Sequence, residues 1–112
     1  MKIVVDAMGT DAAPLPEIAG AVRALRDQPD LSILLVGDAG KLKAEVERHR
    51  VPRDRLTIVP STEIIGMDEK PAEALRKKKD SSIAVAARLL REGRGDALVS
   101  AGNTGAVAAA LP

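Results

Sequence analysis

Four short apolar segments alternate along this chain with segments in which apolar residues recur at helical spacing. The apolar segments are 2–6, 31–37, 55–61 and 96–100. Continuous apolar runs of this length are typical of strands that are covered on both faces. The helical segments are 15–27, 39–49, 71–79, 83–92 and 104–111. This alternation predicts an α/β fold, in which a parallel sheet lies between two layers of helices.

Composition excludes several kinds of site. A chain of 112 residues fits one small domain, and the absence of cysteine excludes disulfides and cysteine-bound zinc. The net charge of +1 and the lack of aromatic residues argue against nucleic-acid binding by bulk charge or by base stacking. The one histidine, His49, continues the apolar stripe of Leu42 and Val46, which favours a structural role.

The amino-terminal sequence MKIVVDAMG enters a strand at once and lacks the long apolar core of a signal peptide. No segment approaches the roughly 18 apolar residues that a membrane-spanning helix needs. The sequence therefore predicts a cytoplasmic protein.

Polar residues follow several of the predicted strands. In open parallel sheets, ligands bind where the strands end at their carboxyl edge. The segments at that edge read DAMGTD, GDAG, PSTEIIGMDEKP and SAGNTG, and the first, third and fourth are the richest in polar residues. We therefore expect a ligand site there.

The SAGNTG segment places two glycines around a polar pair at the start of a predicted helix. Gly102 and Gly105 allow positive φ and close backbone approach, and the amino end of a helix binds anions. The hydroxyls of Ser100 and Thr104 and the amide of Asn103 add hydrogen-bond donors. The same residues also suit an ordinary turn and cap, and no lysine follows the second glycine as in a Walker loop.

Two further clusters each allow two interpretations. Asp6 ends the first strand and Asp11 follows in its loop; these carboxylates either serve in a site or tie the loop to backbone N–H groups. A phosphatase-type nucleophile is disfavoured, because Met8 stands where the second acid belongs. The basic run Arg76–Lys79 is either a solvated helix end, which the helix dipole favours, or a docking patch for an acidic partner or a phosphate.

Several stretches together resemble the bacterial phosphate acyltransferases of phospholipid synthesis. They are VVDAMGTDAAP, VGD, IIGMDEKPAEALRKKKDSSIAVA and ALVSAGNTGAVAAA, and they span nearly the whole chain in order. The blocks GMDEKPAEALRKKKDSSI and SAGNTGA are the most specific. One position departs from the family pattern, because Thr10 stands where a second glycine is usual, which bears on the geometry of that loop.

The resemblance implies a three-layer, Rossmann-like α/β/α fold related to phosphotransacetylases and isopropylmalate dehydrogenases. Residues 1–112 would be the amino-terminal part of a larger domain. The implied reaction moves a fatty acyl group from acyl carrier protein to inorganic phosphate, without a metal or other cofactor. The acyl phosphate would feed a glycerol-3-phosphate acyltransferase, and the full-length enzyme would be a cytoplasmic homodimer, peripherally associated with the membrane.

The resemblance also suggests roles for residues. We expect catalytic roles for Asp6, Asn103 and Thr104. Phosphate or substrate binding is expected for Gly9, Asp11, Lys78, Lys79, Asp80, Ser81, Ser100, Gly102 and Gly105. Arg76 and Lys77 are expected to dock the acidic carrier protein.

Two alternatives remain open. One is a phosphotransacetylase-like enzyme that uses acyl-CoA, and the other is a fragment that binds anions without catalysis. The 112-residue chain alone is expected to be inactive, and Pro112 to be a cut rather than a natural end, because no cap follows Leu111.

Overall fold

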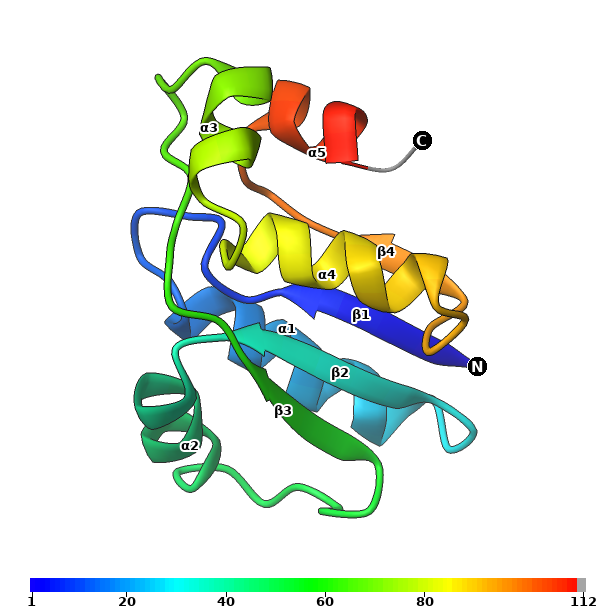
Figure 1. The fold of residues 1–112 in the computed structure, drawn as a ribbon. Helices are drawn as coiled ribbons and strands as arrows, with labels where there is room; N and C mark the ends of the chain where they lie inside the picture. The colour runs from blue at the N-terminus through cyan, green and yellow to red at the C-terminus, as the bar shows by residue number, and fades with distance from the viewer. Residues whose placement is uncertain (111–112) are drawn as a thin grey trace.

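The structure, a computed structural model, describes residues 1–110 apart from the side chain of Thr104 (Figure 1). One parallel sheet has the strand order β3-β2-β1-β4. Its strands are β1 (Lys2–Asp6), β2 (Ser32–Gly37), β3 (Leu56–Pro60) and β4 (Ala97–Val99). The chain adds β2 and β3 on one side of β1 and then crosses to add β4 on the other. The topological switch point, where open α/β sheets bind ligands, therefore lies between β1 and β4.

Helices cover both faces of this sheet. They are α1 (Leu15–Asp27), α2 (Ala39–Val46), α3 (Pro71–Lys77), α4 (Ser82–Arg91) and α5 (Thr104–Ala110). In Figure 1, α4 crosses the front face over β1, and α1 lies on the opposite face. The predicted Rossmann-like α/β arrangement is confirmed.

Each face of the sheet has its own apolar core. Leu35 points toward α1 and α2, where it packs with Ile18 and Leu42. The next residue, Val36, points toward α4 and packs with Val85. Successive side chains of a strand alternate between faces, so a strand buried on both faces must be apolar throughout. This explains the continuous apolar runs in the sequence.

A third apolar cluster joins α3 and α5 to the start of α4. Ala74 from α3, Ile83 from α4 and Ala106 from α5 are all buried in it. Gly105 permits the close contact, because a Cβ atom there would lie 2.5 Å from Cγ of Pro71. The segment 61–70 runs from the end of β3 past the carboxyl edge of the sheet to this cluster (Figure 1).

The helix ends differ from the prediction by up to three residues. Helix α2 ends at Val46 rather than at His49, because the N–H groups of Arg48 and His49 bond carbonyls only three residues earlier. Helix α3 ends at Lys77 rather than at Lys79, because Lys78 leaves the helical backbone conformation, with φ −108° and ψ 69°. The predictions for Leu111 and Pro112 lie outside the described residues. Within the described part, no helix has the length and apolar character that crossing a bilayer requires.

Two glycine-to-alanine substitutions test this packing. Gly95→Ala places a Cβ atom 2.4 Å from Cγ2 of the fully buried Val4, so we expect it to lower the free energy of unfolding by about 1–3 kcal/mol. Gly20→Ala, inside α1 with no atom within 4 Å of the new Cβ, should raise it by about 0.5–1 kcal/mol. Urea denaturation of both variants measures this. Equal shifts in one direction would contradict the packing described.

Candidate functional site

A hydrogen bond between side chains joins the ends of β1 and β4 at the switch point. Ser100 Oγ donates to Asp6 Oδ2 over 2.9 Å and accepts from the Gly102 N–H over 3.1 Å. The other carboxylate oxygen, Asp6 Oδ1, accepts from the Met8 N–H over 3.1 Å. Asp6 is only 1% exposed. The carboxylate thus fixes the loop after β1 and the loop after β4 together, as one wall of a candidate site.

Two glycines let these loops touch. A Cβ atom on Gly9 would lie 2.7 Å from the Gly102 nitrogen, and one on Gly102 would lie 3.3 Å from Ile83 Cδ1. Gly102 and Gly105 do not use the positive φ that glycine allows, and among the described glycines Gly93 alone has it. At Gly9 and Gly105 the neighbouring backbone or the Pro71 ring leaves no space for a Cβ atom, whereas a Cβ atom on Gly102 would be in tight contact.

The unusual Thr10 anchors the first loop to α1. Its hydroxyl donates to Glu17 Oε2 over 2.8 Å, while Glu17 Oε1 is buried without a hydrogen-bond partner in the described structure. Asp11 is exposed on this loop, away from the buried carboxylate of Asp6.

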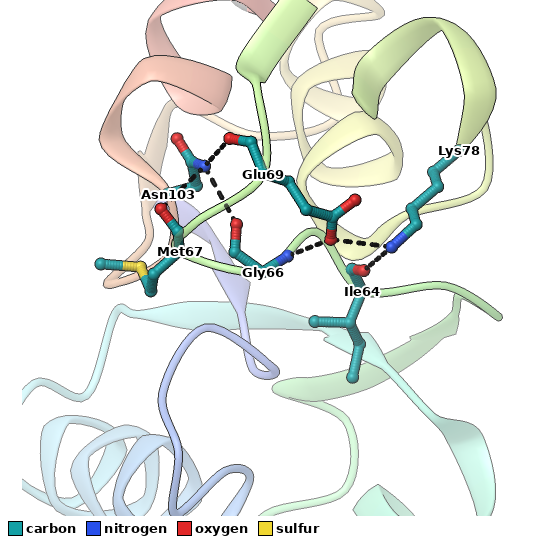
Figure 2. A network of polar contacts seen from close by, with 6 residues as sticks. All are labelled: Ile64, Gly66, Met67, Glu69, Lys78 and Asn103. Atoms are coloured by element: carbon teal, nitrogen blue, oxygen red, sulfur yellow. Dashed lines mark hydrogen bonds and ion pairs between the residues drawn. The ribbon is translucent and has the colours of Figure 1, made fainter. Parts of the chain in front are cut away.

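Asn103 connects the β4–α5 loop to segment 66–69 (Figure 2). Its Nδ2 donates to the carbonyls of Gly66 and Glu69, each over 3.0 Å, and to that of Met67 over 3.4 Å. Its Oδ1 accepts from the Ala106 N–H over 3.0 Å and so caps α5. Because Asn103 is 5% exposed and both polar atoms bind protein groups, this geometry gives it a positioning role. A direct catalytic role stays a prediction.

Lys78 holds the same segment from the other side (Figure 2). Its Nζ lies 2.8 Å from both Glu69 Oε2 and the Ile64 carbonyl oxygen, and the Gly66 N–H donates to Glu69 Oε2 over 2.6 Å. The hydrogen bond from Lys78, followed by that from Gly66, lowers the pKa of the Glu69 carboxyl. The charged group of Lys78 therefore binds segment 64–69. Its contact with phosphate stays a prediction.

The residues between α3 and α4 hold the corner of the chain. Ser81 is buried and caps α4 by accepting from the Ala84 N–H over 3.1 Å. Asp80 accepts from the hydroxyl and the N–H of Thr62 over 2.7 and 3.0 Å. Lys79 is exposed. Asp80 thus holds the start of segment 61–70 in place, and Ser81 is engaged at the start of α4.

The structure therefore gathers Asp6, Gly9, Ser100 and Gly102 at one place and links Asn103 and Lys78 to segment 64–69. It leaves Asp11, Arg76 and Lys79 exposed. The sequence analysis missed the roles of Glu69 and Glu17. For Glu69, no regular spacing pairs it with a lysine nine residues later, across a loop and a helix. The side chain of Thr104 lies outside the described structure. Within residues 1–110, no three acidic or histidine side chains gather as metal ligands do.

Residues 1–111 match the family model described as "Fatty acid synthesis protein". The chain is 52% identical to the phosphate acyltransferase of Heliobacterium modesticaldum over 98% of this chain and 33% of the relative. It is 51% identical to that of Desulfitobacterium hafniense over 98% of this chain and 32% of the relative. It is 48% identical to the phosphate acyltransferase of Halothermothrix orenii over 97% of this chain and 33% of the relative. The chain spans about a third of the length of these curated relatives.

Asn103→Ala should lower the free energy of unfolding by about 2–3 kcal/mol, because it removes a helix cap and leaves loop carbonyls without their donor. Asn103→Asp is the matched variant. It keeps an oxygen for the Ala106 N–H but turns a carboxylate toward three carbonyls, so we expect a loss at least as large. Urea denaturation measures both. If the aspartate variant were as stable as wild type, capping alone would explain this residue.

The Glu69–Lys78 pair should make stability depend on pH. Because the folded pKa of Glu69 is lowered from its ordinary value of 4.5, the stabilisation is present above that value and lost as pH falls through the folded pKa. Lys78→Gln should therefore raise the pKa of Glu69 toward 4.5 in an NMR titration of its carboxyl carbon. Lys77→Gln, which breaks only the Glu73 pair, is the control. An unchanged Glu69 pKa in Lys78→Gln would refute the assigned cause.

Proposed function

Given that this chain belongs to the fatty acid synthesis protein family, we propose that it is the amino-terminal part of a phosphate acyltransferase. The full-length enzyme moves a fatty acyl group from acyl carrier protein to inorganic phosphate and releases acyl phosphate. The observation that carries the proposal is the buried Asp6–Ser100 hydrogen bond at the switch point, where two glycine loops meet beside the start of α5.

In the proposed reaction, a phosphate oxygen attacks the thioester carbonyl carbon. A C–O bond forms, an oxyanion develops on the carbonyl oxygen, and the C–S bond then breaks to release the carrier thiolate. Phosphate is already nucleophilic at neutral pH, so the protein needs to hold it in line and to stabilise the oxyanion. Positioning of this kind contributes up to about 7–11 kcal/mol in ideal cases.

Backbone N–H groups suit both tasks. The first N–H groups of a helix have no partner within that helix and attract anions. Gly102, Asn103 and Gly105 surround the start of α5 at the carboxyl edge, which supports an anion cradle there. The Asp6 carboxylate is engaged by Ser100 and Met8, so its proposed contribution is to fix the shape of the cradle.

The facing segment offers apolar surface for the acyl thioester. Ile64 is 46% and Met67 is 65% exposed, next to the carbonyls that Asn103 holds. Homodimer formation, cytoplasmic location, peripheral membrane contact and supply of a glycerol-3-phosphate acyltransferase stay predictions from the family resemblance.

The test uses the full-length protein, radiolabelled inorganic phosphate and two acyl donors, acyl carrier protein and acyl-CoA. We expect acyl phosphate to form from the carrier-bound donor and only weakly from acyl-CoA. The reverse preference would favour a phosphotransacetylase-like enzyme. If neither donor gives acyl phosphate, the protein lacks this activity and the alternative of anion binding without catalysis is favoured.

Ser100→Ala should lower kcat/KM for phosphate by about ten- to hundredfold, a loss of ~1.4–2.7 kcal/mol of transition-state stabilisation. The reason is that the hydroxyl joins Asp6 to the Gly102 N–H. Ser32→Ala, at the amino end of β2 on the opposite edge of the sheet, is the control. Steady-state kinetics with phosphate as the varied substrate measures the effect. Wild-type kinetics in Ser100→Ala would remove this hydrogen bond from the proposed site.

A further inference from the structure

A groove between α3, α4 and α5 combines three cations with an apolar floor. Its volume is about 320 Å³, and its lining contains no acidic residue. The lining residues are Leu75, Lys79, Ala84, Arg88, Arg91, Ala109 and Ala110. The apolar side chains come from all three helices, and α5 contacts both α3 and α4 (Figure 1).

The two arginines are fixed but not neutralised. Arg88 Nη2 lies 3.4 Å from the Lys79 carbonyl oxygen, and Arg91 Nη1 lies 2.5 Å from that of Ala110. The Lys79 carbonyl lies in the linker between α3 and α4, and that of Ala110 at the end of α5, so each arginine extends across the groove wall. Helix α4 reads SIAVAARLLR and contains no acidic residue. Among the residues that the structure describes, Lys79, Arg88 and Arg91 take part in no ion pair.

The neighbouring lysines differ. Lys77 pairs with Glu73 over 3.0 Å, and Lys78 pairs with Glu69 over 2.8 Å. The helix dipole of α4 favours cations in its last turn and explains part of the arginine placement. It does not explain Lys79, which comes from another element, or the shared concave lining. Unneutralised positive charge therefore collects in the groove, whereas on α3 Lys77 is paired and Arg76 alone is exposed with no ion pair among the described residues.

We propose that this groove docks an acidic helical surface of the acyl carrier protein. The inference rests on the proposed function, which requires a protein-bound acyl donor, and it shifts the predicted docking site away from Lys77. Carboxylates on the partner would meet Lys79, Arg88 and Arg91, while a small apolar side chain enters the floor between Leu75 and Ala84. An anionic membrane is disfavoured, because a flat lipid surface reaches the rim of a groove but not its floor.

The experiment uses the full-length protein and the double variant Arg88→Glu/Arg91→Glu. We expect KM for the acylated carrier protein to rise by about tenfold or more, with KM for phosphate unchanged, and the salt dependence of kcat/KM to weaken. Because charge reversal next to α5 risks misfolding, Arg88→Gln/Arg91→Gln is the second variant. It keeps amide donors for the two carbonyls and should give a smaller rise in the same KM. Arg23→Glu/Arg26→Glu, on the exposed face of α1, is the matched control.

Binding measurements distinguish a failure of the docking proposal from a failure of the proposed function. Carrier-protein binding by fluorescence anisotropy and flotation with phosphatidylglycerol vesicles are measured for wild type and both groove variants. Folded variants with unchanged KM and unchanged carrier binding would overturn the proposal, as would loss of vesicle binding with carrier binding intact. If wild type binds the carrier through these arginines but forms no acyl phosphate, the docking surface stands and the proposed function fails.

Discussion

The buried carboxylate of Asp6 is the constraint on which the site depends. A carboxylate withdrawn from water costs several kcal/mol unless hydrogen bonds replace its hydration. Here the replacements come from the Ser100 hydroxyl and the Met8 N–H, which belong to the loops after β4 and β1. Satisfying one charge therefore fixes both loops. The same demand explains Gly9, because a Cβ atom there would lie 2.7 Å from the Gly102 nitrogen and separate the two loops.

A second set of polar contacts attaches the third wall. Asn103 follows Gly102 directly, caps α5 and holds the carbonyls of segment 66–69, while the Lys78–Glu69 pair holds that segment from α3. The three segments at the carboxyl edge thus form one connected unit. Such preorganisation suits the proposed acyl transfer to phosphate, in which the protein would contribute chiefly position and fixed dipoles.

Sequence patterns predicted the local structure and missed the long-range contacts. The apolar runs placed the four strands, because hydrophobic period and burial act over a few residues. The direction of the Asn103 side chain was missed, since its partners lie 34–37 residues earlier and are backbone carbonyls that no residue type marks. The Glu69–Lys78 pair was missed because its residues are nine positions apart, on either side of α3, a spacing that no regular element pairs. The family resemblance indicated candidate segments for the site, but not which of their polar atoms are already hydrogen-bonded to protein groups.

In the proposed function, inorganic phosphate binds where β1 and β4 end. Hydrogen–deuterium exchange of the full-length protein, with and without saturating inorganic phosphate, tests it most directly. The account predicts slower amide exchange in peptides covering residues 7–11 and 100–106, with little change in α2 and β3. Protection confined to other segments, or none at saturating phosphate, would contradict the account.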